Sequence, residues 1–370
     1  MTTGYGFYDL STDCGALIRT APTHNSHKLW QTDEPFIKTG ENKALPTTNT
    51  LFQMNTLCYF LEGHKNCYSL PLQEAYRKFL FRAGFYYGNY DGLSKPPSFR
   101  LEIDGNIWAN VTTSMSEEMI YYELFYITKK SRTSMCLIRT MDSDVPFISS
   151  LEAHYIYDTY KWMDNTTALY VHNRINYGAS TSVERGMNLH AQHYNRIWKS
   201  KEISNYLNIH VEFIDYDYMF GENRPPWMVM GYAIQARNLT DSIYLSIDFS
   251  PRTAVQAYFI LYFMDPVSRF EQNQTSSVEI YIEDNKMAVT DIPNIDGYLY
   301  DRFHAVTLFS LPVNGSANVT ISPAEGSTLA PLLNAMEVFS AIDVSEGGHL
   351  FNFSSVLFII SLHVLIILVT

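Results

Sequence analysis

The sequence predicts an all-β fold, with two tandem β-sandwiches of the jelly-roll kind followed by an apolar C-terminal segment. Short runs of alternating apolar and polar residues recur along the chain, separated by turns rich in Gly, Pro and Asn, while helical periodicity is scarce. One such run also returns about 180 residues later, which indicates a duplicated unit. Runs of short strands with few helices are typical of sandwiches.

The run FRAGFYYGNYDG, residues 81–92, predicts a strand that enters a turn. Because side chains alternate along a strand, one face carries Phe81, Ala83, Phe85 and Tyr87, and the other carries Arg82, Gly84 and Tyr86. After a loop containing Pro, SFRLEIDGN predicts a half-buried strand that ends in an Asp-Gly turn.

The second half repeats this order of elements. VQAYFILYFMD corresponds to the first strand, and SVEIYIEDN corresponds to the half-buried one. PFISSLEAHYI, from Pro146, is matched by PLLNAMEVFSA, from Pro331, and this match places Glu152 and Glu337 in corresponding positions.

The repeat predicts the domain organisation. The first sandwich spans residues 5–158 and the second spans residues 205–344. Residues 159–204 mix aromatic and polar side chains, so we expect an ordered crossover there and not a floppy linker.

Charge and composition narrow the class of partner. The formal net charge of −12 argues against a nucleic-acid partner, because phosphate binding needs a basic face. The same acidic balance slightly favours a basic peptide. A charged fraction of 17% beside 15% aromatic residues suits a β-rich extracellular protein better than a disordered or coiled-coil one.

The two ends of the chain carry different indications about membrane targeting. The start, MTTGYGFYDL, has neither a basic region nor an apolar core, so it is not a signal peptide. Residues 350–370 are apolar over the length that a bilayer span requires. Three interpretations stay open: a C-terminal transmembrane anchor, a GPI-attachment signal, or a gene product cut at both ends.

Sequons and cysteines bear on the cellular compartment. The spacing of the four cysteines contains no C-x-x-C pair, which excludes the usual zinc and redox motifs but permits up to two disulfides. Seven N-x-S/T sequons favour the secretory pathway, and they lie at Asn110, Asn165, Asn238, Asn273, Asn314, Asn318 and Asn352.

Several motifs together resemble the malectin-like domain of plant receptor-like proteins and receptor kinases. In the first half these are DCG at Asp13, FIKTGEN, HKNCYSL, FRAGFYYGNYDG and VPFISSLEAHYI. In the second half they are NRIW, VMGYAIQARN and STLAPLLNAMEVF. The resemblance implies two tandem malectin-type β-sandwiches, in the extracellular part of a receptor that senses cell-wall material, peptides or microbial partners.

The resemblance also bears on the cysteines and has two departures. Cys14, Cys67 and Cys136 lie in family-like motifs, so we expect one structural disulfide among them, whereas Cys58 has no such context. Family receptors usually continue into leucine-rich repeats, a membrane span and a kinase, and no such repeat or kinase motif occurs here. YFMDPVSRF also replaces the family's more usual His-Phe-Ala-Glu type of strand end.

The opening loop is a candidate ligand site. Tyrosine rings suit the CH faces of sugars, and carboxylates accept hydrogen bonds from sugar hydroxyls. Tyr86, Tyr87, Tyr90 and Asp91 could therefore bind carbohydrate. The alternative is structural: Tyr87 lies in the core, the neighbouring sandwich covers Tyr86, and Asp91 caps the turn.

Catalysis and metal binding have weak support. A glycosidase needs two carboxylates across a cleft, but Glu102 and Asp104 share the solvent side of a predicted strand near Asp91. His190 and His193 have a spacing that could ligate a metal, but no third ligand is evident. No G-x-S-x-G elbow is present. We expect no enzyme, metal or cofactor.

These observations predict a non-catalytic binding module at the plant cell surface, held at the membrane through its C-terminal segment. Its ligand, a cell-wall carbohydrate or a peptide, would lie between the two sandwiches or on the loops at their edges. A co-receptor or kinase partner would carry the signal. The alternatives are a carbohydrate-active enzyme and a nonfunctional fragment of a receptor kinase gene.

Overall fold

The computed structural model describes residues 9–19, 29–46, 49, 51–72, 75–116, 118–157, 159–183, 196–211, 221–250, 254–267, 274–293 and 303–345. Over these ranges β-strands are nearly the only regular secondary structure, which confirms the predicted all-β class. Helical turns in this part are limited to η1 (Phe52–Met54) and α1 (Trp227–Met230).

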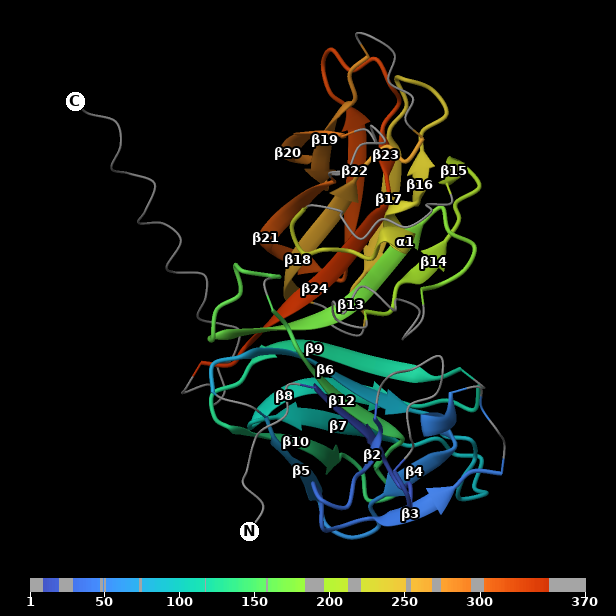
Figure 1. Ribbon diagram of the computed structural model, residues 1–370, viewed down its shortest axis with the longest axis vertical. Coiled ribbons are helices and arrows are strands. Elements are labelled where there is room, and N and C mark those ends of the chain that lie inside the picture. The colour runs from blue at the N-terminus through green and yellow to red at the C-terminus, as the bar shows by residue number, and fades with distance from the viewer. Residues whose placement is uncertain are drawn as a thin grey trace, which may run out of the picture.

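The first half of the chain forms three sheets (Figure 1). The first sheet contains, in spatial order, β2 (Gln31–Thr32), β1 (Asp9–Asp13), β12 (Ser150–Tyr155), β6 (Lys78–Phe85) and β9 (Ile120–Ile127). A second sheet has the order β5 (Lys65–Pro71), β10 (Arg132–Arg139), β7 (Ser98–Ile103) and β8 (Asn106–Thr112). A small third sheet consists of β11 (Phe147–Ile148), β4 (Thr56–Tyr59) and β3 (Glu41–Ala44).

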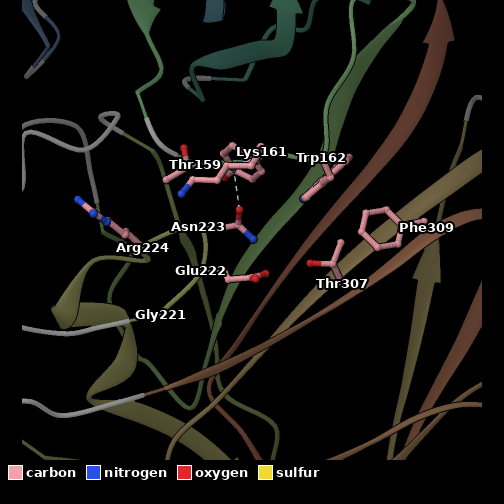
Figure 2. Close-up of a pocket in the computed structure, with 10 residues that line it drawn as sticks. Thr159, Lys161, Trp162, Gly221, Glu222, Asn223, Arg224, Thr307 and Phe309 are labelled. Carbon is pink, nitrogen blue, oxygen red and sulfur yellow. Dashed lines mark hydrogen bonds between the residues drawn. The ribbon is translucent and has the colours of Figure 1, made fainter.

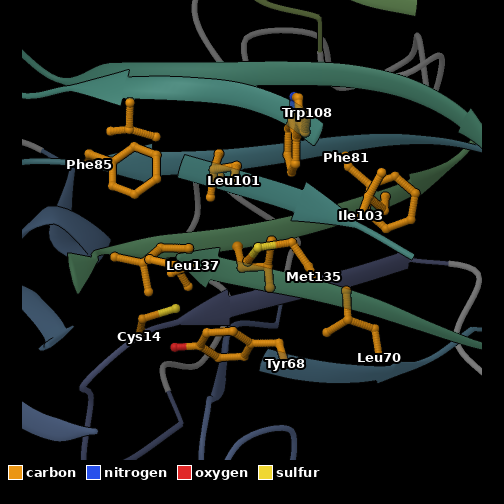
Figure 3. Packing of buried hydrophobic residues seen from close by; sticks show 14 of the residues in the cluster. Cys14, Tyr68, Leu70, Phe81, Phe85, Leu101, Ile103, Trp108, Met135 and Leu137 are labelled. Carbon is orange, nitrogen blue, oxygen red and sulfur yellow. The ribbon is translucent and has the colours of Figure 1, made fainter. Parts of the chain in front are cut away.

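A core of large side chains fills the space between these sheets, as Figure 3 shows. Phe81 and Phe85 of β6 belong to the same buried cluster as Leu101 of β7 and Leu137 of β10. The predicted alternation is confirmed on this face of β6, because Ala83 and Tyr87 also belong to that cluster. Burial of such side chains contributes about 1.5–3 kcal/mol each to folding.

The second half has a matching order of strands. The large sheet continues with β14 (Lys199–Lys201) beside β13 (Thr167–Tyr177), then β24 (Ala335–Asp343), β18 (Ala254–Phe263) and β21 (His304–Asn314). A bend and hairpin lead from β21 into β22 (Ser316–Pro323), which lies between β17 (Ile243–Asp248) and β19 (Ser277–Ile282), with β20 (Asn285–Asp291) beyond. The small sheet here is β15 (Leu207–His210), β16 (Tyr232–Gln235) and β23 (Leu332–Leu333).

Two glycines occupy equivalent places in the two halves. Gly15 follows β1 with φ +79°, and a Cβ there would lie 2.1 Å from the carbonyl oxygen of Leu57. Gly178 follows β13 with φ +78°, and a Cβ there would lie 2.2 Å from the carbonyl oxygen of Ala233. Only glycine fits such a position, so the repeat extends to β13.

Both β13 and β14 lie within residues 159–204, the stretch predicted as a crossover, so part of this stretch belongs to the large sheet. The predicted division into sandwiches at 5–158 and 205–344 stays a prediction.

Strands β9 and β13 join the two halves. Phe125 of β9 pairs with Leu169 of β13, so one large sheet runs through both halves, as the adjacent β9 and β13 ribbons in Figure 1 show. A further buried cluster spans the junction, with Phe125 and Leu169 packed together with Ile260 and Phe339. Shared backbone pairing and a shared core make the junction a fixed part of the fold.

One disulfide links the edge strand β5 to its neighbour β10 in the four-stranded sheet of the first half. Cys67 of β5 lies directly opposite Cys136 of β10, and the two are bonded with their Cα atoms 4.0 Å apart. This confirms the prediction of one structural disulfide among the three family-like cysteines. Cys14 and Cys58 are buried free thiols.

In the part of the chain that the structure describes, no helix is long and apolar enough to cross a membrane. Residues 350–370, predicted as an anchor or GPI signal, lie outside the described residues.

A candidate ligand-binding cleft

Most side chains of the predicted aromatic loop make hydrogen bonds or packing contacts within the protein. The Tyr87 hydroxyl donates to Asp91 Oδ1 at 2.6 Å, and the same oxygen accepts from the Leu93 amide at 3.0 Å. Tyr90 is buried against Phe147, with ring centroids 5.5 Å apart, and Tyr86 is buried as well. Burial and the bond to Asp91 raise the pKa of Tyr87 to about 12. Carbohydrate binding by these four residues stays a prediction.

The carboxylates considered for catalysis hold strands together. Glu102 forms an ion pair with Lys65, and it is buried, although the strand pattern predicts it on the solvent side. Asp104 accepts from the Ser134 amide at 2.7 Å and from the Tyr126 hydroxyl at 3.0 Å. Both acids thus have structural partners.

Metal binding has no support within the described ranges. No group of three or more His, Cys, Asp or Glu side chains there could hold a metal ion. His190 and His193 lie outside these ranges.

A cleft of about 570 Å³ lies beside the junction of the two halves. Its walls are residues 159–162, residues 221–224, and Thr307 and Phe309 of β21, as Figure 2 shows. Ligand pockets in proteins typically measure about 300–1,000 Å³, so the cleft is large enough for a small ligand. Sequence reasoning missed it because its walls come from three separate segments, two of them loops.

One wall of the cleft is aromatic. Trp162 stacks on Tyr258 of β18, with ring centroids 5.5 Å apart and planes only 7° from parallel. Phe309 meets Trp162 edge to face at 5.2 Å. Phe309 is 51% exposed, so it offers an apolar surface at the cleft that nothing in the described fold covers completely.

Four buried polar atoms of the lining have no hydrogen-bond partner among the described residues. They are Thr159 Oγ1, Trp162 Nε1, Asn223 Nδ2 and Thr307 Oγ1. Buried polar groups are almost always bonded, and an unsatisfied one costs about 1–3 kcal/mol. Each of the four atoms is shielded from solvent, so these polar groups lie behind the surface of the cleft and not on it.

The cleft loops are held in conformations that few residues adopt unaided. Tyr160 has φ +48° and Asn223 has φ +60°. The two are fixed against each other, because the Tyr160 amide donates to Asn223 Oδ1 at 2.9 Å. Arg196 lies beneath them and donates to the Asn223 carbonyl at 2.8 Å and to the Tyr160 hydroxyl at 2.7 Å. The Asn223 side chain therefore keeps a fixed direction in the cleft.

A ladder of buried charges underlies this arrangement. Six side chains alternate in sign across the large sheet, in the order Glu152, Arg82, Glu123, Arg174, Glu337 and Arg196. Arg174 Nη1 donates to Glu123 at 2.6 Å and its Nε donates to Glu337 at 2.6 Å, which ties β9 to β24 through β13. We call this set the charge ladder.

Neighbouring charges compensate for burial within the ladder. Burial opposes the ionisation of Glu123, but the guanidinium groups of Arg82 and Arg174 outweigh it and lower the pKa of this carboxyl below its usual value. Glu337 also accepts hydrogen bonds from Tyr262 at 2.7 Å and from Tyr160 at 2.9 Å. The ladder ends, through Arg196, at the cleft.

Asp13 makes the stability of the fold depend on pH. Burial raises the pKa of Asp13 from 3.8 to about 6, partly offset by a 2.6 Å bond from the Thr56 hydroxyl and reinforced by Asp33. The folded state thus binds this proton more tightly than the unfolded chain. We expect the free energy of unfolding to rise by about 1.4 kcal/mol as the pH falls from about 7 to about 5. This added stabilisation is lost when the pH rises again through about 6.

The measurement is the urea midpoint at a series of pH values. Asp13→Asn keeps an oxygen for Thr56 but cannot titrate, so its midpoint should depend less on pH than that of the wild type. An unchanged slope in Asp13→Asn would assign the effect to other groups, such as the nearby Asp33, whose pKa burial also raises.

The fold and the cleft define an all-β protein made of repeated strand units, with a polar and aromatic cleft at their junction. The chain belongs to the malectin-like domain family, whose family model matches residues 12–341. The family resemblance inferred from the motifs is thereby confirmed.

Relatives in sequence occur in Arabidopsis thaliana. The chain is 29% identical over 348 residues to the uncharacterized protein At1g24485, covering 92% of this chain and 66% of that protein. It is 28% identical over 349 residues to the probable LRR receptor-like serine/threonine-protein kinase At1g07550, covering 91% of this chain and 38% of the kinase. The chain thus spans less than two thirds of each relative.

Solved structures share the fold. The ANX2 ectodomain from Arabidopsis thaliana superposes with a TM-score of 0.69 at 16% identity, over 90% of this chain and 97% of that one. A chain from the complex of the plant peptide RALF23 with FER and LLG2 superposes with a TM-score of 0.67 at 14% identity, over 91% of this chain and 96% of that one.

Proposed function

We propose that this chain is the ligand-recognition part of a receptor-like protein at the plant cell surface. It lies outside the cell, binds a cell-wall carbohydrate or a peptide, and carries out no catalysis. The observation that carries the proposal is the junction cleft, whose lining combines the aromatic residues Trp162 and Phe309 with polar residues such as Thr159, Asn223 and Thr307. Such a mixture of apolar surface and a few convergent polar groups is typical of small-ligand sites.

The family supports the receptor context. Relatives include receptor-like kinases, and the FER structure contains a peptide and a second protein, LLG2. By analogy, the proposed receptor acts with a co-receptor or kinase partner. The C-terminal segment 350–370 is the proposed membrane attachment.

Two structural features favour the secretory pathway. A disulfide such as Cys67–Cys136 persists in oxidising compartments and is rare in the cytosol. The sequons within the described ranges all present an exposed asparagine, and these are Asn110, Asn165, Asn238, Asn314 and Asn318. The predicted sequon at Asn273 lies outside these ranges.

Hydrogen exchange can test the cleft directly. The full chain would be expressed in plant cells behind a secretory leader, purified, and mixed with a soluble plant cell-wall extract. We expect slower amide exchange in residues 159–162, 221–224 and 307–309, since a bound ligand would cover these segments.

The matched control region is the four-stranded sheet of the first half, around β7 and β10, whose exchange should not change. Absence of protection in the three cleft segments, with extracts that contain both glycans and peptides, would contradict the proposed function.

A further inference from the structure

We infer that Asn238 carries an N-linked glycan whose first sugar rings pack into a hollow beside Tyr206 and Tyr244, so that the glycan becomes part of the folded surface. The inference rests on the secretory location in the proposed function. It goes beyond that function, because it concerns a modification of this chain and not its ligand. The hollow shares no lining residue with the junction cleft.

The acceptor asparagine lies at the edge of this hollow, which we call the Asn238 hollow. It measures about 320 Å³, and its lining consists of residues 205–206, Arg237, residues 240–242 and Tyr244. Ligand pockets in proteins start at about 300 Å³, so the space is large enough for a sugar ring. Asn238 itself is exposed, in the loop between β16 and β17.

Two contacts connect the sequon to the hollow. Thr240, the hydroxyl residue of the sequon, belongs to the lining. Asn238 Nδ2 donates to Asp241 Oδ2 at 2.7 Å, and Asp241 also belongs to the lining. The atom that receives the sugar is therefore within hydrogen-bond distance of a side chain of the hollow.

Glycosylation leaves this contact available. In the transfer, the bond from Asn238 Nδ2 to C1 of the first N-acetylglucosamine forms as the C1–O bond to a lipid-linked diphosphate donor breaks. Nδ2 loses one of its two hydrogens as a proton. The remaining hydrogen can still donate to Asp241, so the first sugar starts beside the hollow.

The hollow offers an aromatic surface to a sugar. Side chains alternate along β17, with Ile243 and Leu245 buried and Tyr244 67% exposed between them. A tyrosine ring suits the apolar CH face of a sugar, while the polar side chains of the lining suit its hydroxyls. Packing of a sugar ring on Tyr244 would remove apolar surface from water.

The floor of the hollow is fixed before any sugar arrives. The Tyr244 amide donates to the Tyr206 hydroxyl at 2.7 Å, which ties the loop before β15 to β17. Arg237 donates from Nε to the Asn205 carbonyl at 3.1 Å and from Nη2 to the Ser204 carbonyl at 3.0 Å. A preorganised surface loses little conformational entropy when the glycan packs on it.

The test measures how well the glycan core is shielded. The full chain would be expressed in plant cells behind a secretory leader, with a mannosidase inhibitor that keeps every N-glycan of the high-mannose type. Endoglycosidase H, which cuts between the first two sugars, is then applied to the native protein. Peptide mass spectrometry follows the cleavage at each sequon separately.

The matched internal control is Asn318 on β22. Its Nδ2 also donates to a carboxylate, Glu283 Oε2 at 3.2 Å, but it projects from a strand far along the chain from the Asn238 hollow. We expect cleavage at Asn238 to be about tenfold slower than at Asn318, because the enzyme reaches the core only when the glycan leaves the hollow.

A substitution in the hollow tests the aromatic contact. Tyr244→Ala should raise the cleavage rate at Asn238 to about that at Asn318 and leave Asn318 unchanged. The control is Tyr157→Ala, which removes a tyrosine that is similarly exposed, at 69%, in the first half. Melting temperatures identify a variant that fails to fold, in which case Tyr244→Thr, which favours strand structure, replaces Tyr244→Ala.

Three results would overturn the inference and leave the proposed function intact. They are equal cleavage at Asn238 and Asn318 in the wild type, slow cleavage at Asn238 that Tyr244→Ala leaves unchanged, and an Asn238 without glycan while other sequons carry one. A chain without glycan at any sequon would contradict both the inference and the secretory location in the proposed function.

Discussion

Glu337→Gln lowers the free energy of unfolding by about 3–5 kcal/mol, the expected cost of removing one partner from a buried ion pair. The glutamine has nearly the same shape, so the change isolates the charge. Arg174 and Arg196 then lie buried beside a neutral amide, and two tyrosine hydroxyls lose a charged acceptor. Urea unfolding followed by tryptophan fluorescence measures the loss.

The control is Glu279→Gln on β19, where a partly exposed carboxylate pairs with the exposed Lys286. Surface pairs contribute little, so this variant should unfold at the wild-type midpoint. Glu337→Gln should also speed amide exchange in residues 221–224. Arg196 would lose its ion pair with Glu337, which helps to hold it against the Asn223 carbonyl. A wild-type midpoint for Glu337→Gln would show that the charge ladder does not stabilise the fold.

Removal of the disulfide with Cys67→Ala and Cys136→Ala should cost about 4 kcal/mol. The bond closes a loop across a sequence separation of 69 residues, and its loss gives that entropy back to the unfolded chain. The urea midpoint of the double variant should fall accordingly.

Dithiothreitol supplies the matched control for this prediction. It should lower the midpoint of the wild type towards that of the double variant and leave the double variant unchanged. If the reductant lowers both midpoints equally, its effect comes from elsewhere in the chain.

Much of the strand framework could be predicted from the sequence because alternation is a local property. The face of β6 that carries Phe81 and Phe85 is buried as predicted. Alternation does not reveal what covers the opposite face. Arg82 on that face is fully buried and forms ion pairs with Glu123 and Glu152. The matched positions of Glu152 and Glu337 were the available signal, since an acid repeated within an apolar strand needs a buried partner.

The cleft could not be predicted in the same way. Its polar side chains lie in loops near residues 159 and 223, where no periodicity constrains the chain, and its aromatic wall combines Trp162 with Tyr258 and Phe309 from two strands. Only the three-dimensional fold brings these together. The disulfide is an intermediate case, because motifs singled out three cysteines but only the register of β5 and β10 decides the pairing.

The backbone pairing between β9 and β13 constrains how occupancy of the cleft could be communicated. Two halves that share one sheet have no hinge about which to close, so the bound and free forms of the described fold should have nearly the same shape. A partner protein would then recognise a composite epitope, made jointly of this chain and the exposed part of its ligand. Ligand and partner would each tighten the binding of the other by the same factor. Recognition would then be the formation of a ternary complex without a conformational change in this chain.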